Sequence, residues 1–184
     1  KAAMDAAAEI KAGSVVTAMT RNGQMFGIRV SGLGDRWFTA PVNTPQGLFF
    51  TGYSQADANP DIGDSAITET YGIGGAAMIA APGVTRFVGA GGMEAAQETS
   101  EEMGELYLQH NPLLQIPSWN FQGACLGLDI RRVVETGITP IINTGIAHKE
   151  AGIGQVGAGT VRAPLACFEQ ALEALAQAMN IQAA

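Results

Sequence analysis

The pattern of apolar and polar positions predicts an antiparallel meander in the first fifty residues. Residues 14–20 and 24–32 are β-favouring runs, and Asn22-Gly23 between them is a strong signal for a hairpin turn. Two more strands are predicted at 36–40 and 47–53. A short helix over 4–13, ended by Gly13, is expected before the meander.

Helical patterns dominate after residue 64. Residues 65–81 are apolar and rich in small side chains, which predicts a buried central helix capped by Asp64 or Ser65. Its glycines would let another backbone approach closely. Further helices are expected at 93–109, 128–137 and 164–180, and short strands at 85–90 and 138–143.

These elements predict an α+β fold, with an antiparallel sheet in the N-terminal part. The buried glycine-rich helix and the further helices are expected to pack on that sheet. Residues 1–184 are expected to form a single domain. Asp129 and Gly137 are typical cap residues of a short helix, and residues 144–164, with many glycines and little periodicity, are predicted to form a long loop.

Composition narrows the class of protein. Only 15% of residues are charged and 24 are glycine, so we expect much mutually packed surface, in a homo-oligomer or in the C-terminal part of a longer chain. The net charge of −7 argues against a nucleic-acid partner. No apolar run is long enough to span a membrane. Cys125 and Cys167 are expected to be free thiols, which predicts a reducing, cytoplasmic location.

The segment of residues 51–75, called here the acid-rich segment, carries Asp57, Asn59, Asp61, Asp64 and Glu69. Its spacing resembles the start of a calcium loop, but Ile62 and Thr68 replace the required Gly and Glu. A looser Mg²⁺ or Ca²⁺ site at the three aspartates stays an alternative to simple turns and caps, and the turns are favoured for Asn59 and Asp64. We expect no metal.

Two glycine arrays, at 72–77 and 152–157, imitate a dinucleotide fingerprint. Neither has the strand–turn–helix context that this motif requires. No cofactor is therefore expected.

A buried strand is predicted to deliver Asn143, Thr144, His148 and Lys149 into the long loop, which Arg162 closes. Cations, an imidazole and polar donors suit a phosphate or carboxylate ligand. The alternative is a plain surface His–Lys pair. Arg29 and Arg36 need acidic partners, and the acid-rich segment is their expected source. His110 is expected at a helix C-terminus.

Three strings carry a resemblance: "GIRVSGLGDRWFTAP", "FTGYSQADANPDIGDSAITETYGIGG" and "VVETGITPIINTGIAHKEAGIGQVGAG". Together they resemble the YlbE-like family over nearly the whole chain. That family includes a subunit of an oxamate carbamoyltransferase that works with FdrA-like and AllH-like subunits. The resemblance implies carbamoyl transfer between phosphate and oxamate or oxalurate, in anaerobic purine (allantoin) catabolism. The familiar carbamoyltransferase motif S-x-R-T-R is absent, so the site must be a different one.

The residues themselves supply candidates for such a site. The catalytic candidates are His148, Lys149 and Glu69. The candidates for binding carbamoyl phosphate, oxamate or oxalurate are Arg29, Arg36, Asp57, Asn59, Asn143, Thr144 and Arg162. A binding site requires these side chains to converge on one cleft. If the region is instead an assembly module, they should be scattered or covered by an apolar interface.

Overall fold

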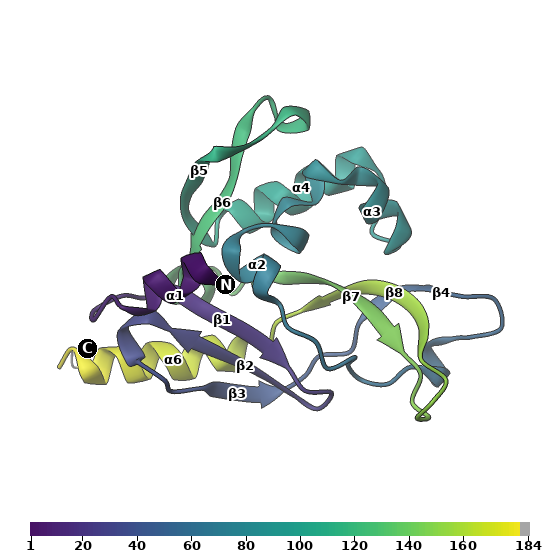
Figure 1. The fold of residues 1–184 in the computed structure, drawn as a ribbon, viewed down its shortest axis with the longest axis horizontal. Coiled ribbons are helices and arrows are strands. Elements are labelled where there is room, and N and C mark those ends of the chain that lie inside the picture. The colour runs from purple at the N-terminus through teal and green to yellow at the C-terminus, as the bar shows by residue number, and fades with distance from the viewer. Residues whose placement is uncertain (181–184) are drawn as a thin grey trace.

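The computed structural model describes residues 1–180 and has the α+β architecture expected from the sequence (Figure 1). Its first sheet has the order β1-β2-β3, formed antiparallel by Val16–Arg21, Met25–Val30 and Phe38–Pro41. The predicted hairpin turn is confirmed. Asn22 Oδ1 accepts from the Met25 N–H at 2.8 Å, and Gly23 has a φ of +93°.

The fourth predicted strand leaves this meander. β4 (Gln46–Phe49) pairs with β8 (Gln155–Arg162), and β8 pairs with β7 (Ile141–Ala147), giving a second sheet of order β4-β8-β7. The long loop predicted over 144–164 is therefore wrong, because these residues form a hairpin. Its glycines allow a close approach: a Cβ on Gly159 would lie 2.2 Å from the Gln46 carbonyl oxygen.

The single helix predicted over 65–81 is also wrong. The chain forms α2 (Ile67–Tyr71), turns at Gly72 with a φ of +99°, and continues as the 3-10 helix η3 (Gly74–Ala80). A Cβ on Gly72 would lie 1.8 Å from the Cys125 carbonyl oxygen, so this glycine combines a left-handed turn with a close approach. Neither predicted cap is used, since Ala66 occupies the N-cap position.

The predicted strand at 85–90 is wrong, because residues 85–87 belong to helix α3 (Pro82–Phe87), which Pro82 starts, and 88–90 form the turn after it. The acidic helix α4 (Met93–Gly104) is confirmed but ends earlier than expected. The chain then enters a hairpin that the sequence did not predict, formed by β5 (Tyr107–Ile116) and β6 (Gln122–Leu128), with the short η4 (Pro117–Trp119) between them. His110 thus lies in a strand, and its Nδ1 is 2.8 Å from the Gly123 carbonyl oxygen.

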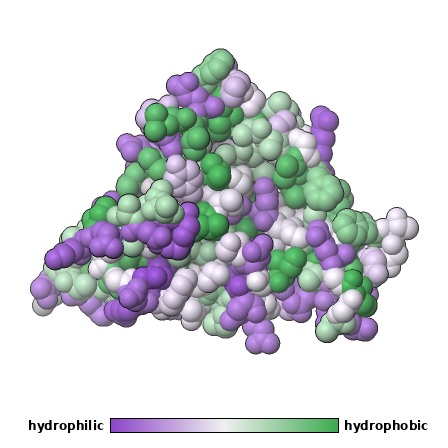
Figure 2. Space-filling view, viewed as in Figure 1, coloured by the Kyte–Doolittle hydropathy of each residue, from purple (hydrophilic) through white to green (hydrophobic). Residues whose placement is uncertain are grey.

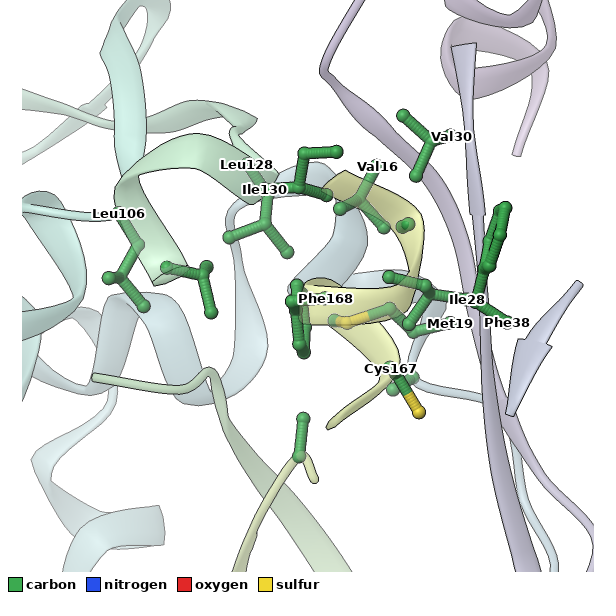
Figure 3. Packing of buried hydrophobic residues seen from close by; sticks show 14 of the residues in the cluster. Val16, Met19, Ile28, Val30, Phe38, Leu106, Leu128, Ile130, Cys167 and Phe168 are labelled. Atoms are coloured by element: carbon green, nitrogen blue, oxygen red, sulfur yellow. The ribbon is translucent and has the colours of Figure 1, made fainter. Parts of the chain in front are cut away.

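The main core lies between the first sheet, α5 (Ile130–Thr136) and α6 (Leu165–Ala178), where Met19, Ile28 and Phe168 are buried (Figure 3). The predicted caps of α5 are confirmed, because Asp129 accepts from the Arg131 N–H and Gly137 is left-handed. Cys125 and Cys167 are free and buried, as expected.

The remaining elements are short. Helix α1 (Ala2–Ala8) ends before Gly13, and two further 3-10 turns, η1 (Ser31–Leu33) and η2 (Gln55–Asp57), interrupt the loops. Within residues 1–180, no helix combines the length and apolar character that crossing a bilayer requires.

Candidate functional site

The acid-rich segment runs antiparallel along the free edge of β7. The Asn59 N–H donates to the Ala147 carbonyl at 2.8 Å, and the Lys149 N–H donates to the Asp57 carbonyl at 2.8 Å. At the other end of β7, the Asn143 N–H lies 3.4 Å from Glu69 Oε1. The two regions singled out from the sequence, residues 51–75 and 141–150, are therefore neighbours in the fold.

Asp57 and Lys149 lie at the exposed end of this pairing. Asp57 Oδ2 accepts from the N–H and the hydroxyl of Ser54, at 2.9 and 3.0 Å, which caps η2. The Ser54 hydroxyl is the largest cause that lowers the pKa of Asp57, and Lys149 adds a smaller effect. Lys149 Nζ donates to the Ala56 carbonyl at 2.7 Å. The Asp57 carboxylate therefore binds within its own loop. The Lys149 ammonium has further N–H groups that can donate to a ligand.

His148 is held beside this pair in a defined orientation. The backbone N–H of His148 donates to the Gly154 carbonyl at 2.8 Å. Its ring packs edge-to-face on the Tyr53 ring, with the two centroids 5.7 Å apart. Nδ1 accepts from the Glu150 N–H at 2.9 Å. Because this bond occupies Nδ1 as an acceptor, the neutral ring carries its proton on Nε2. His148 therefore offers a donor to a ligand.

Asn59 has a structural role in the same loop. Its Nδ2 donates to the Asp61 carbonyl at 2.5 Å, which closes the turn at Pro60. The turn directs the chain from the exposed end of β7 towards its buried middle.

Arg21, Asp61 and Thr144 form a buried network at the middle of β7. Arg21 Nη1 donates to Asp61 Oδ1 at 2.8 Å and to Thr144 Oγ1 at 2.9 Å. Asp61 Oδ2 also accepts from the backbone N–H groups of Gly23 and Gly63. Thr144 is thereby committed to a structural contact.

Arg21 was not among the candidates read from the sequence, although it is the buried cation that the acid-rich segment binds. A signal was present: the period of two along β1 places Arg21 on the face of Met19, which is buried. The residue also directly precedes the hairpin turn at Asn22.

Glu69 lies at the opposite end of β7 and is 3% exposed. Its carboxylate accepts from the Gly75 N–H at 2.9 Å and from the Thr68 hydroxyl at 2.6 Å. Among residues 1–180 no salt bridge to Glu69 is present. The Tyr107 hydroxyl donates to the Glu69 carbonyl at 2.5 Å, and burial raises the pKa of this phenol well above its usual value.

A cavity of about 410 Å³ lies between η3 and the β5–β6 hairpin. Its lining is mainly apolar and includes Gly74 and Asn143. Asn143 Oδ1 is buried and accepts no hydrogen bond from the described part of the chain. Asn143 of β7 therefore lines the cavity with an amide oxygen that has no hydrogen-bond donor among the described residues.

The side chains of the three arginine candidates contact other residues, although Arg162 itself pairs with Ile141 at the start of β7. Arg29 pairs with Asp35, not with the acid-rich segment as expected, and packs on Trp37. Arg36 stacks over Phe38, with 5.1 Å from Cζ to the ring centroid. The remaining arginine, Arg162, donates to Glu102 Oε2 at 2.6 Å and to the Thr139 carbonyl at 2.9 Å.

The candidates thus fall into separate groups. His148, Lys149, Asp57 and Asn59 share one end of β7; Thr144 lies at its middle; Glu69 and Asn143 share the other end. The three arginines join none of these groups. Over residues 1–180, no cluster of three or more His, Cys, Asp or Glu side chains could hold a metal ion.

Comparison with known proteins identifies relatives over nearly the whole chain. A family model described as oxamate carbamoyltransferase subunit AllG matches residues 1–65. The oxamate carbamoyltransferase subunit AllG of Escherichia coli K12 is 86% identical over 181 residues, covering 98% of this chain and 43% of that protein. The uncharacterized protein YahG of the same organism is 54% identical over 172 residues, covering 94% of this chain and 36% of YahG.

A solved structure has the same fold. The crystal structure of a conserved protein of unknown function from Enterococcus faecalis V583 matches with a TM-score of 0.87 and 50% identity. The match covers 91% of this chain and 40% of that one, so the chain spans less than half the length of each of these relatives. These similarities support the assignment of the chain to the YlbE-like family, the family of the AllG subunit.

Proposed function

We propose that the chain is part of a subunit of an oxamate carbamoyltransferase-like enzyme. The observation that carries this proposal is the 86% identity to AllG over 98% of the chain. The enzyme would transfer a carbamoyl group between phosphate and oxamate, in the cytoplasm, during anaerobic purine and allantoin catabolism. FdrA-like and AllH-like subunits are its proposed partners.

The proposed reaction forms one bond and breaks one bond at the carbamoyl carbon. The amide nitrogen of oxamate attacks the carbamoyl carbon of carbamoyl phosphate, so a C–N bond forms and the C–O bond to phosphate breaks. Oxalurate and phosphate are the products, and the proton from the amide nitrogen passes to the departing phosphate. Both substrates are anions, so a site needs fixed donors that stabilise the charge developing on oxygen.

We place the anion at the exposed end of β7. Lys149 keeps N–H donors beyond its bond to Ala56, and the neutral His148 ring offers Nε2–H. These two donors suit a phosphate oxygen and the carbamoyl carbonyl. In this tautomer His148 polarises the carbonyl and does not act as a base. Asp57 and Asn59 hold the loop, since their side chains bond to it.

Glu69 and Thr144 have positioning roles in this proposal. Glu69 is buried, and its carboxylate joins Gly75 to the start of β7, while Thr144 joins the middle of β7 to Arg21. Together they fix the strand that carries His148 and Lys149. Asn143 is left as the polar contact for a group entering the neighbouring cavity.

A second candidate function is that of an assembly module. It is favoured by the separation of the candidate residues and by the engagement of Arg29 and Arg162 in ion pairs. In that case the chain would position partner subunits while the chemistry takes place elsewhere in the enzyme.

Steady-state kinetics of the complete enzyme, containing this chain with its partner subunits, distinguish the two functions. We expect Lys149→Met to raise the KM for carbamoyl phosphate about tenfold or more, because one charge-assisted contact is lost. Lys11→Met, on another exposed lysine, is the matched control and should leave KM unchanged. An unchanged KM in Lys149→Met, with a complex that is intact by sedimentation, would favour the assembly module.

A further inference from the structure

The cavity between η3 and the β5–β6 hairpin has the size of a small-molecule site. Its volume is about 410 Å³, and ligand pockets usually measure about 300–1,000 Å³. None of the described residues that line it is charged, in a chain whose net charge is −7. Figure 2 shows hydrophobic side chains at the surface of the upper part of the molecule, where this hairpin and helices α3 and α4 lie in Figure 1.

Small side chains leave the space that forms the cavity. Ala77 and Ala80 of η3 and Ala124 of β6 line it, at positions where larger residues would fill it. Ala77 also interrupts the helical conformation of η3, with φ −134° and ψ 44°. The bend in η3 therefore lies at the wall of the cavity.

Hydrogen bonds and close packing hold the walls in place. The Ile79 N–H donates to Ser100 Oγ at 3.0 Å, and the Ser118 hydroxyl donates to the Ile79 carbonyl at 2.6 Å. These bonds tie η3 to α4 and to η4. A Cβ at Gly75 would lie 2.1 Å from the Ile141 carbonyl oxygen, so η3 also lies directly on β7. The cavity is thus preformed, as small-molecule sites usually are.

One polar side chain joins this apolar lining from β7. Successive residues of a strand face opposite sides, and Thr144 faces Arg21 while Asn143 lines the cavity. Asn143 Oδ1 is buried and accepts no hydrogen bond from residues 1–180. A buried carbonyl oxygen without a donor is unfavourable, and the N–H group of a ligand can supply that donor. Gln115, the other polar residue of the lining, is exposed.

The lining defines the chemistry of a ligand. A charged group would lose its hydration there without gaining an ion pair, because no charged side chain among the described residues lines the cavity. An apolar body would pack on the alanines and on Ile116, and an amide N–H would meet Asn143 Oδ1. Carbamoyl phosphate, oxamate and oxalurate are all anions, so none of them matches this lining.

We propose that the cavity binds a small uncharged molecule that combines an apolar body with a carboxamide N–H donor, which Asn143 accepts. This site is distinct from the anion site at the exposed end of β7. Asn143 and His148 are five residues apart along an extended strand, a separation of about 16 Å. The inference goes beyond the proposed function and does not rest on it.

Ligand-observed NMR titration of the full-length protein tests the proposal with benzamide, an uncharged ring that carries one carboxamide. We expect saturable binding with a dissociation constant of about 1 mM or lower, as suits a probe of this size. Benzoate has the same ring with a carboxylate in place of the amide. It should bind at least about tenfold more weakly, because its charge would be buried without a partner.

Four variants locate the probe. Asn143→Leu keeps the size of the side chain and removes its amide, so it should weaken benzamide binding about tenfold and leave the binding of toluene intact. Ala80→Phe places a ring in the cavity from its exposed rim and should weaken the binding of both probes about tenfold or more. Ala6→Phe, at an exposed position of α1, is the matched control and should bind as the wild type does. Lys149→Met should also leave benzamide binding unchanged.

Circular dichroism reports whether each variant folds, and Ala81→Phe replaces Ala80→Phe if the latter does not. A folded wild type that binds no benzamide up to about 10 mM would overturn the proposal. Equal affinities for benzamide and benzoate would also overturn it, as would wild-type affinity for benzamide in folded Asn143→Leu or in the folded Phe variant of the rim. Weakened benzamide binding in Lys149→Met would place the probe at the anion site and exclude the cavity.

Discussion

Arg21 Nη1 lies 2.8 Å from Asp61 Oδ1, and the side chains of this ion pair are 2% and 1% exposed. The pair joins the first hairpin to the acid-rich segment, and Thr144 extends it to β7. Asp61 accepts two further backbone N–H groups, so its carboxylate is well satisfied although it is buried. Three regions distant in sequence therefore meet at this ion pair, two of them at the Asp61 carboxylate and the third at the Arg21 guanidinium.

We predict that Asp61→Asn destabilises the fold strongly. Removing one partner of a buried pair leaves the Arg21 charge uncompensated, which costs about 3–5 kcal/mol in the free energy of unfolding. Asp35→Asn is the matched control, because Asp35 pairs with Arg29 at the surface and is 97% exposed. Its expected cost is below about 1 kcal/mol. Urea unfolding measures both, and similar small losses in the two variants would contradict a structural role of the buried pair.

Gly75→Ala is predicted to be destabilising for a steric reason. A Cβ at Gly75 would lie 2.1 Å from the Ile141 carbonyl oxygen, and the backbone of η3 or of β7 would have to move. The matched variant Gly104→Ala has no neighbouring atom within 4 Å at the end of α4 and should be neutral or stabilising by less than about 1 kcal/mol. Thermal unfolding of the two variants gives the comparison. An unchanged midpoint for Gly75→Ala would show that η3 does not pack on β7 as described.

The two thiols are predicted to react slowly in the folded chain. Burial raises the pKa of Cys125 and of Cys167 to about 11, so at pH 8 only about one thiol in a thousand is the reactive thiolate. Labelling with a thiol-specific disulfide reagent should be slow without denaturant and should reach both cysteines in urea. Fast labelling of either native thiol would contradict its burial.

The same pKa shifts predict how stability depends on pH. Below about pH 7.5 the thiols are almost fully protonated in both states, so they give stability no pH dependence there. As the pH rises from about 9 to 11, the unfolded chain loses its thiol protons before the folded chain does, and stability falls. For each thiol, the full difference between its folded and unfolded pKa corresponds to roughly 2–3 kcal/mol in the free energy of unfolding. Urea unfolding at pH 8 and pH 10, with Cys125→Ser as the comparison, measures this loss.

Local chemistry made several elements predictable from the sequence. Asn22-Gly23 forms a turn because of its own conformational preference. Asp129 begins α5 because its carboxylate accepts a backbone N–H, and Gly137 ends it because glycine easily adopts a left-handed conformation. The candidate site required Asp57 and Glu69 to lie near residues 141–150, and both contact that segment, but at opposite ends of β7.

The errors arose where tertiary contacts override local preference. Gly159 belongs to a strand because β4 approaches its backbone, and Gly72 ends α2 because Cys125 lies against it. When the spatial neighbours of such glycines are unknown, the sequence alone predicts a loop or a helix in their place. Arg21 was missed for a related reason, since its partner Asp61 is forty positions away.

Isothermal titration of carbamoyl phosphate into the full-length protein tests the central claim most directly, which is that the exposed end of β7 binds the anionic substrate. We expect saturable binding by the wild type and by Lys11→Met. We expect affinity about tenfold lower or worse for Lys149→Met and for His148→Ala, because each removes one donor to the anion. Equal affinity in all four proteins, each folded by circular dichroism, would contradict a substrate site at this end of β7.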